Sequence, residues 1–465
     1  MTSTVNKLPR PSPSLSPAGR PPSPPTPRPP SSRRHRLPQS RQPVGRDKTA
    51  LVLAGGGITG VVYEIGALHA LDQYFGKDFT IADFDMIVGL SAGGFVGSFL
   101  ANGVTPEAMF TALRNDPHAP IAPFPKWDVF QPNFAEFFER ALALPCTLAA
   151  NTFKRLRSAT VGGNPYVSVF DEILPSGLFT NDRVESYVRH SLHRLGRTND
   201  FRQLRRTLYI VATELDTGDR IVFGDEAHDH VPISKAVQAS TAIPLFYRPV
   251  RVGRRDYVDG AMRKTLHVDI AIAKGAKLIV CINPVVPLRN DIEREAVPLF
   301  EGKGRYLREK GFGYIAWQML RVLLHSRIEL GLERYQRLYP DVDIILIEPR
   351  MDDYRMFFHN IMDYEARVPL AKHGNDTVMA HLSEHFDEYA AIFARHGIEL
   401  ARPGRRIPLS VPAHRPAPPR APALRSDLDI SRLQASLDAL EARLTDRTPP
   451  PPEAVGRLIA TQSER

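Results

Sequence analysis

The sequence predicts an α/β fold, a three-layer α/β/α domain with a mostly parallel central sheet. Two short apolar segments, Thr49–Gly55 and Phe84–Leu90, each precede a segment in which apolar residues have helical spacing. Strands without a polar face are typical of a parallel sheet that helices cover on both sides. The first two helices are expected over 61–74 and 92–103.

The same alternation continues along the chain. Thr207–Leu215 and Asp219–Gly224 are expected to be strands around a turn, and a short helix follows that ends at Pro244. A hairpin that turns at Gly253 comes next. The remaining elements are expected to be a helix over 267–276, a strand over 277–284, a strand over 341–349 and a closing helix over 376–397.

Composition places the folded body at residues 47–400. Residues 1–46 contain thirteen prolines and no acidic residue, and residues 401–425 contain seven prolines. We therefore expect a disordered tail and a Pro-rich linker there, with a second disordered tail over 448–465. Residues 426–447 repeat Ile and Leu at spacings of three and four, which predicts an amphipathic heptad-like helix. Its apolar stripe, 428–444, is expected to dock on the body or on a partner.

The net charge of +9 belongs to the N-terminal tail. That tail carries nine Lys and Arg residues, so the remainder has 51 basic and 51 acidic residues and is formally neutral. We therefore expect no binding of nucleic acid. Two cysteines cannot form a disulfide framework, and no apolar signal core follows the basic start. The expectation is a cytoplasmic protein with neither a signal peptide nor a transmembrane helix.

Glycines follow the first predicted strand. Gly55, Gly57 and Gly60 have the G-x-G-x-x-G spacing of a dinucleotide-binding loop, which also expects an acidic residue after the second strand. The second strand ends instead on GLSAG, residues 89–93, a G-x-S-x-G elbow that presents Ser91 on a sharp strand-to-helix turn. The N-terminus of the following helix would favour negative charge on that serine.

A serine nucleophile needs a base, and the sequence offers two kinds of candidate. His267, His359 and His373 lie after Ser91 in the chain, but none stands in a distinctive motif. Asp259, in YVDGA at the end of a predicted strand, is the stronger candidate. Exclusion of water raises the pKa of a carboxyl group and makes its carboxylate a better proton acceptor. An Asp-Gly pair is also a common turn, so the pair alone leaves its role open.

Taken together, GGGITG, GLSAG and DGA resemble the patatin-like phospholipase family. That family carries a glycine-rich oxyanion loop, a G-x-S-x-G elbow and an Asp-Gly motif in this order. The resemblance runs from about Lys48 to Asn283 and includes residues 239–250, just before the aspartate. It implies a Ser–Asp dyad without a histidine. The site residues that it implies are Ser91 as nucleophile, Asp259 as base, and Gly55, Gly56 and Gly57 as the oxyanion hole.

The resemblance implies a lipid acyl hydrolase, a carboxylic ester hydrolase of the phospholipase A or neutral lipid esterase type. It would form an acyl-serine intermediate and need neither a cofactor nor a metal. The family usually has Arg or Lys where this chain has Thr59, which leaves neutral esters open as substrates. Peripheral contact with a membrane or a lipid-droplet surface is expected, and 313–332 is amphipathic enough either for that or to cover a core.

Two other functions stay open at the level of sequence. One is an ordinary α/β-hydrolase esterase with a Ser-His-Asp triad. The other is a non-catalytic lipid-binding or scaffolding protein, in which the tails and the heptad-like helix matter most. Residues 225–232 hold two histidines among three acids, but a solvated loop fits them better than a metal site. The sequence assigns no role to residues 285–400.

Overall fold

The computed structural model describes residues 46–403, except 115, 117, 126–129, 141, 144–173, 292–305 and 360–363. The predicted N-terminal tail up to residue 45, the linker from residue 404 and the heptad-like segment 426–447 lie outside the described residues. The predictions made for them stay predictions.

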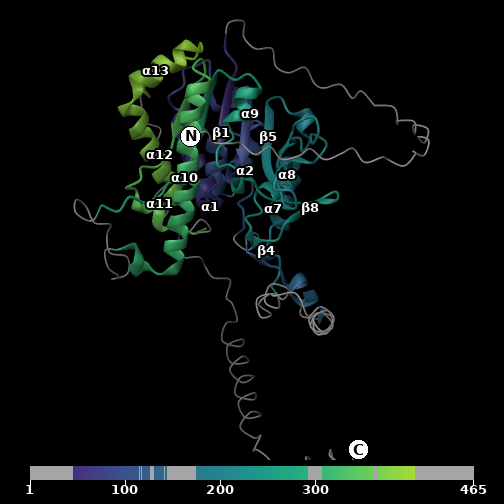
Figure 1. The fold of residues 1–465 in the computed structure, drawn as a ribbon. Coiled ribbons are helices and arrows are strands. Elements are labelled where there is room, and N and C mark those ends of the chain that lie inside the picture. The colour runs from purple at the N-terminus through teal and green to yellow at the C-terminus, as the bar shows by residue number, and fades with distance from the viewer. Residues whose placement is uncertain are drawn as a thin grey trace, which may run out of the picture. The chain divides into compact units, whose positions relative to one another are not determined.

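The centre of the fold is an eight-stranded sheet with the order β11-β10-β1-β2-β5-β9-β8, in which β6 also pairs with β5 (Figure 1). The strands from β11 to β5 are parallel to one another, as their apolar sequences predict. Strands β6 and β9 are antiparallel to β5. The strands are β1 (Thr49–Leu53), β2 (Met86–Leu90), β5 (Thr207–Glu214), β6 (Arg220–Phe223), β8 (Val250–Val252), β9 (Arg255–Asp259), β10 (Leu278–Ile282) and β11 (Asp343–Ile347).

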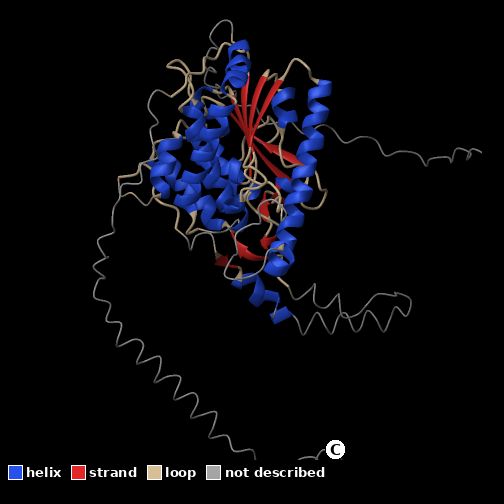
Figure 2. Ribbon diagram, turned by 90° about the vertical axis from the view of Figure 1, so that its left-hand side faces the viewer, coloured by secondary structure: helices blue, strands red, loops and turns tan. Residues whose placement is uncertain are grey.

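Helices cover both faces of the sheet, which confirms the three-layer α/β/α fold (Figure 2). On one face, Ile270 of α9 and Ile328 of α10 belong to one buried cluster with strand residues such as Val52 and Val88. On the opposite face, α2 packs on Ile87 of β2. The helices are α1 (Gly57–Asp72), α2 (Ala92–Leu100), α3 (Pro106–Leu113), α7 (Asp182–Arg194), α8 (Ile233–Ser240), α9 (Val268–Ala273), α10 (Phe312–Leu338), α11 (Tyr354–Phe358), α12 (Arg367–Glu384) and α13 (Phe386–Arg395).

A second, three-stranded sheet lies beside the main one and consists of β3 (Gln131–Pro132), β4 (Gly177–Thr180) and β7 (Leu245–Tyr247). Residues 134–140 are also helical, and short 3₁₀ turns occur as well. These turns are η1 (Ile81–Asp83), η2 (Phe201–Gln203), η3 (Gly260–Met262) and η4 (Leu307–Lys310).

The closing helix differs from its prediction over 376–397. The structure has two helices there, α12 and α13, because the chain turns at His385, and α12 begins nine residues earlier, at Arg367. Gly374 and Asn375 are poor helix formers, so the sequence pattern misses this part of α12. Contacts with α1 explain why they are helical: Asn375 Oδ1 lies 2.9 Å from the Nδ1 atom of His69.

Helices α1 and α12 approach each other so closely that a side chain does not fit between them. A Cβ atom added at Gly66 would lie 2.1 Å from the carbonyl oxygen of Ala371 and 2.9 Å from the backbone nitrogen of Asn375. Helix α1 begins in the glycine loop, so its position in the fold also sets the position of that loop.

The amphipathic segment predicted over 313–332 forms most of α10. Its buried residues are Gln318, Arg321, His325 and Ile328, at spacings of three and four, so this face of α10 packs on the body. Three of these four residues are polar. In the described part of the chain, no helix combines the length and the hydropathy that spanning a bilayer requires.

Candidate active site

Ser91 lies in a sharp turn between β2 and α2. Its backbone has φ 51° and ψ −115°, a conformation that residues other than glycine rarely adopt. A Cβ atom at Gly89 would lie 2.4 Å from the carbonyl oxygen of Gly93, and one at Gly93 would lie 2.4 Å from a carbonyl oxygen of β1. The Ser91 N–H donates to Ser240 Oγ at 2.8 Å, and the Gly93 N–H donates to the Ala54 carbonyl oxygen at 2.9 Å. The G-x-S-x-G segment therefore adopts the predicted strand–turn–helix geometry.

Asp259 is the last residue of β9, and the strand register brings it to this turn. Strands β2 and β9 both pair with β5, where Leu90 lies opposite Val211 and Asp259 lies opposite the next residue, Ala212. The two strands therefore end at the same level of β5. The Ser91 hydroxyl lies near the Asp259 carboxylate and acts to lower the pKa of that group. The backbone N–H two residues further along donates to Asp259 Oδ1, at 2.9 Å.

The environment of Asp259 makes it a stronger base than a carboxylate in water. Its side chain is 3% exposed. Burial raises its pKa from 3.8 to about 6, although the nearby Ser91 hydroxyl and the hydrogen bond from the Ala261 N–H act in the opposite direction. At neutral pH the group is therefore mostly ionised and ready to accept a proton.

The predicted glycine loop connects β1 to α1 and lies against Ser91. A Cβ atom at Gly55 would be 3.1 Å from Ser91 Cβ and 3.7 Å from Ser91 Oγ. Gly57, with φ 60°, is the first residue of α1. The first N–H groups of a helix have no partner within it and form the positive end of its dipole. The loop therefore lies beside the serine, and the start of α1 follows it directly.

Thr59 contributes a hydroxyl group, and no charge, to this loop. Its side chain is buried, and Thr59 Oγ1 donates to the Gly56 carbonyl oxygen at 3.3 Å. The Thr59 hydroxyl thus forms its hydrogen bond within the first turn of α1. No cation stands at the position where the family usually has one.

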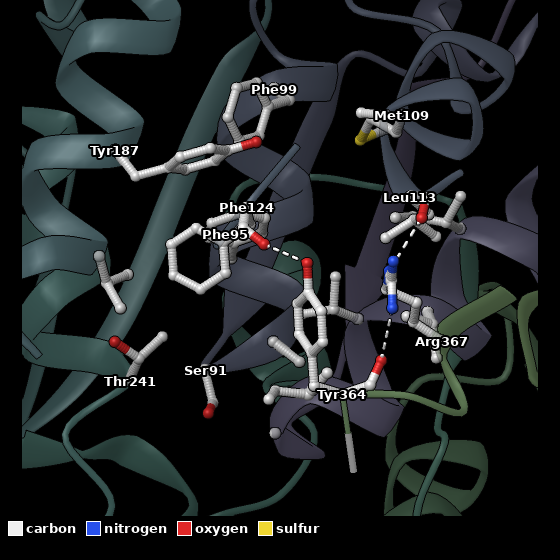
Figure 3. A pocket seen from close by; sticks show the side chains of 18 of the residues that line it. Ser91, Phe95, Phe99, Met109, Leu113, Phe124, Tyr187, Thr241, Tyr364 and Arg367 are labelled. Atoms are coloured by element: carbon white, nitrogen blue, oxygen red, sulfur yellow. Dashed lines mark hydrogen bonds between the residues drawn. The ribbon is translucent and has the colours of Figure 1, made fainter. Parts of the chain in front are cut away.

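An apolar pocket of about 130 Å³ lies beside Ser91, which lines it at one end (Figure 3). Two of its polar groups are turned to backbone carbonyl oxygens: Tyr187 donates to that of Ala122 at 2.7 Å, and Arg367 Nε to that of Leu113 at 2.9 Å. The pocket is lined by Gly57, Ile58, Val61, Val62, Ile65, Ser91, Ala92, Phe95, Phe99, Met109, Ala112, Leu113, Ile121, Phe124, Val184, Tyr187, Thr241, Ile243, Tyr247, Tyr364 and Arg367.

None of the three candidate histidines lines the pocket beside Ser91. Burial lowers the pKa of His267 to about 3, and neither of its ring nitrogens has a hydrogen-bond partner within the described residues. His373 pairs with Asp353 at 2.6 Å, and His359 is the residue after α11. In the described ranges, no group of three or more His, Cys, Asp and Glu residues is placed to hold a metal ion.

Two parts of the site were not identified from the sequence. Ser240 holds the turn, because its Oγ accepts from the Ser91 N–H and donates to the Val211 carbonyl oxygen at 2.6 Å. Tyr364 and Arg367 line the pocket from a region to which the sequence assigned no role. Ser240 lies inside the segment 239–250 that resembles the family, so that resemblance contained a signal for it; Tyr364 and Arg367 had none.

Comparisons with known proteins agree with the motifs. Residues 51–272 match the family model described as patatin-like phospholipase, which confirms the predicted resemblance over this part of the chain. The uncharacterized protein YqhO of Bacillus subtilis (strain 168) is 25% identical over 222 residues, which is 45% of this chain and 62% of YqhO. The chain thus spans less than two thirds of that relative.

Solved structures with partial similarity include three proteins. VipD from Legionella pneumophila has a TM-score of 0.32 at 15% identity, over 73% of this chain and 67% of VipD. The ExoU–SpcU complex from the type III secretion system of Pseudomonas aeruginosa has a TM-score of 0.28 at 16% identity, over 73% of this chain and 52% of the matched chain. Human GIVD cytosolic phospholipase A2, in complex with methyl gamma-linolenyl fluorophosphonate, has a TM-score of 0.32 at 10% identity, over 76% of this chain and 60% of the matched chain. These likenesses are weak and carry no argument about activity.

Proposed function

We propose that this patatin-like phospholipase domain is a lipid acyl hydrolase in which Ser91 is the nucleophile and Asp259 its base. The observation that carries the proposal is the placement of the Ser91 hydroxyl near the buried Asp259 carboxylate, at one end of an apolar pocket. A serine on a strained turn, a carboxylate with a pKa of about 6 and the N–H groups at the start of a helix together suit acyl transfer.

The proposed reaction has two halves. Asp259 takes the proton of Ser91 Oγ while that oxygen attacks the ester carbonyl carbon, and the N–H groups of Gly55, Gly56 and Gly57 stabilise the tetrahedral oxyanion. The intermediate expels the alcohol, which receives the proton from Asp259, and leaves an acyl-serine ester. Water, deprotonated by Asp259, then attacks this ester, and the fatty acid leaves as the proton returns to Ser91. Each oxyanion donor contributes about 3–4 kcal/mol in comparable enzymes.

The pocket supports an acyl chain as the group that is recognised. The hydroxyls of Tyr187 and Tyr364 and the Arg367 guanidinium are directed to backbone carbonyl oxygens, which leaves apolar walls toward the cavity. Burial of each CH₂ group there would contribute about 0.8 kcal/mol to binding. Since Thr59 provides no charge for a phosphate, we propose that selection acts on the acyl chain, so that neutral glycerides are cleaved as well as phospholipids.

The test is fatty-acid release from phosphatidylcholine vesicles, phosphatidylglycerol vesicles and emulsified diacylglycerol. Wild type is compared with Ser91→Ala and with the matched variant Ser98→Ala, which removes a buried hydroxyl of α2 that donates to the Phe95 carbonyl oxygen at 2.7 Å. We expect release by the wild type and by Ser98→Ala, and none by Ser91→Ala. A folded wild type that releases nothing from any of these lipids would instead favour the lipid-binding or scaffolding alternative.

Hydrolysis should depend on pH through Asp259. The base acts in its ionised form, and its pKa is about 6. We therefore expect kcat/KM to be constant above about pH 7 and to fall tenfold per pH unit well below pH 6. The measurement uses a soluble short-chain ester between pH 4.5 and pH 8, a range over which thermal unfolding confirms that the protein stays folded. A rate that is unchanged down to pH 4.5 would exclude this carboxylate as the base.

Replacement of His267 separates the dyad from the Ser-His-Asp alternative. The imidazole is buried and neutral, and it has no partner among the described residues. His267→Leu is therefore expected to keep kcat/KM within about threefold and to stabilise the fold by up to about 1–3 kcal/mol, since an unsatisfied buried polar group is removed. Urea unfolding and ester hydrolysis measure both effects. Abolished hydrolysis in a folded His267→Leu protein would favour a histidine base.

Exposed apolar side chains next to the pocket support contact with a lipid surface. We name the apolar lip as Phe134, Phe138, Leu178 and Leu245. Leu245 is 85% exposed, and its φ of 69° is a strained conformation for leucine, so a strained backbone holds an apolar side chain in contact with solvent. Leu245 pairs with Gly177, the neighbour of Leu178, and Asn133, which precedes Phe134, donates its N–H to the Leu178 carbonyl oxygen. The same strand as Leu245 provides Tyr247 to the pocket lining.

A Leu245→Asn variant tests this role of the apolar lip. Asparagine tolerates positive φ better than leucine, so the fold is expected to be retained. Vesicle binding by cosedimentation and hydrolysis of vesicle lipids are expected to fall about threefold to tenfold, as roughly 1 kcal/mol of apolar contact is lost. Hydrolysis of a monomeric short-chain ester should not change. Leu330→Asn, at a site on α10 that is 67% exposed, is the control. Equal losses on both substrates would contradict a role in surface binding.

A further inference from the structure

The glycine loop rests on a second loop that lies beyond the region of the family match. Residues 283–288 follow β10, whereas the match ends at residue 272. A Cβ atom at Gly56 would lie 2.8 Å from Pro284 Cγ and 3.3 Å from Val285 Cγ2, and both of these residues are buried. Interiors are close-packed, so a shift of this second loop would move Gly56 as well.

The support loop, residues 283–288, is not part of a strand, and α10 side chains bind its backbone groups instead. Gln318 Oε1 accepts from the Leu288 N–H at 3.0 Å, and Gln318 Nε2 donates to the Leu288 carbonyl oxygen at 2.8 Å. Arg321 Nη1 donates to the Val286 carbonyl oxygen at 3.1 Å. The two side chains thus fix the backbone of the support loop at positions 286 and 288.

Arg321 is an unusual residue for such a buried place. Its side chain is 3% exposed, and burial lowers its pKa to about 10. Within the described residues it has no carboxylate partner, and its second contact is a hydrogen bond to the Met356 carbonyl oxygen at 3.3 Å. The rings of Trp317 and Phe357 lie 5.2 and 5.0 Å from its guanidinium carbon. Burial of a charge without an opposite charge is unfavourable, so the stability of α10 alone does not account for this arginine.

A third contact completes the attachment at the start of the support loop. Asn283 Nδ2 donates to Glu348 Oε2 at 2.9 Å, and Glu348 Oε1 lies 3.2 Å from His325 Nε2. Residues 318, 321 and 325 are spaced three and four apart, so they lie on one face of α10. One polar face of α10 therefore binds the support loop, directly at positions 286 and 288 and through Glu348 at position 283.

We propose that Gln318 and Arg321 are positioning residues for ester hydrolysis, which they assist by holding the support loop against Gly56. The inference rests on the proposed function, because it assumes that the Gly56 N–H stabilises the oxyanion. Both side chains act through Pro284 and Val285. A displaced donor weakens binding of the oxyanion and leaves the acyl pocket unchanged. Loss of either side chain is therefore expected to lower kcat and to leave KM unchanged.

The test compares Gln318→Leu and Arg321→Met with two controls on the exposed part of the same helix, Gln336→Leu and Arg334→Met. Kinetics use a soluble short-chain ester, and circular dichroism and thermal unfolding establish that each protein is folded. We expect kcat to fall by about tenfold to a hundredfold in the first pair, with KM within twofold of the wild type, and no change in the controls. An alkyl boronic acid, which forms a tetrahedral anion on serine, should bind more weakly in proportion to kcat, while a fatty alcohol should bind equally well.

A third variant, Pro284→Ala, approaches the same contact from the other side and leaves α10 intact. It is expected to lower kcat selectively in the same way. A folded Gln318→Leu or Pro284→Ala protein with the kcat and boronate affinity of the wild type overturns the proposal, and so does a rise in KM at constant kcat. Failure of the proposed function looks different, because the wild-type protein would then hydrolyse no ester.

Discussion

An Asp259→Asn variant is expected to lose ester hydrolysis and, at the same time, to unfold at a higher temperature than the wild type at pH 8. The amide cannot accept the proton of Ser91, so kcat/KM should fall by about 10³-fold to 10⁴-fold. Its carbonyl oxygen can still accept from the Ala261 N–H, which donates to the Asp259 carboxylate at 2.9 Å in the wild type. The turn is therefore expected to keep its geometry.

The gain in stability follows from the direction of the pKa shift. Burial raises the pKa of Asp259 from 3.8 to about 6, so the folded protein holds its proton more tightly than the unfolded chain does. The contribution of Asp259 to the free energy of unfolding is therefore highest below about pH 3.8, and it falls as the pH rises to about 6. At most about 3 kcal/mol is lost, at 1.36 kcal/mol per pKa unit. Asparagine stays neutral and avoids this loss.

Urea unfolding at pH 4 and pH 8 measures the gain, which should appear at pH 8 and be nearly absent at pH 4. The control is Asp256→Asn on the same strand, where the carboxylate pairs with Arg251 near the surface. It is expected to change stability by no more than about 1 kcal/mol and to leave hydrolysis intact. An Asp259→Asn protein that still hydrolyses esters at the wild-type rate would show that another group is the base.

Gly66→Ala and Gly331→Ala are expected to change stability in opposite directions. Both residues lie inside helices, where alanine is intrinsically favoured over glycine by about 0.5–1 kcal/mol. At Gly331 the nearest atom to an added Cβ is 3.9 Å away, so that gain should be observed. At Gly66 the new Cβ would lie 2.1 Å from the Ala371 carbonyl oxygen, so α1 and α12 must move apart.

We expect Gly66→Ala to lower the free energy of unfolding by about 3 kcal/mol or more, as overpacked sites do. Urea unfolding of both variants, in parallel with the wild type, is the measurement. Hydrolysis should also decrease in Gly66→Ala, because α1 carries the glycine loop at its first turn. A Gly66→Ala protein as stable as Gly331→Ala would mean that the two helices can separate at little cost.

The sequence was informative wherever structure depends on residues close together in the chain. Apolar runs predicted the parallel strands, and the hairpin at Gly253 forms with φ 62° at that glycine. The GLSAG turn was predictable because only glycine fits at its first and last positions. The family resemblance then brought Ser91 and Asp259 together, although no local pattern relates residues so far apart.

The parts that the sequence missed depend on contacts between distant segments. Helix α12 contains Gly374 and Asn375, whose helical state is set by the surface of α1. The amphipathic pattern of α10 did not predict its buried polar face. That face is explained by the support loop, whose backbone groups its side chains bind. The wall of the pocket formed by Tyr364 and Arg367 has no motif of its own, since an apolar cavity needs only suitable shape and paired polar groups.

Strand β10 lies between β11 and β1, in the interior of the sheet, but it begins at residue 278, after the match to the family has ended. A chain that ended where the match ends, at residue 272, would leave five residues of β1 without a neighbour on that side. All five are buried in the intact protein. Such an unprotected apolar edge is a template for association between molecules, so the shortened chain would be expected to aggregate. The smallest piece suitable for expression therefore has to extend at least through β11.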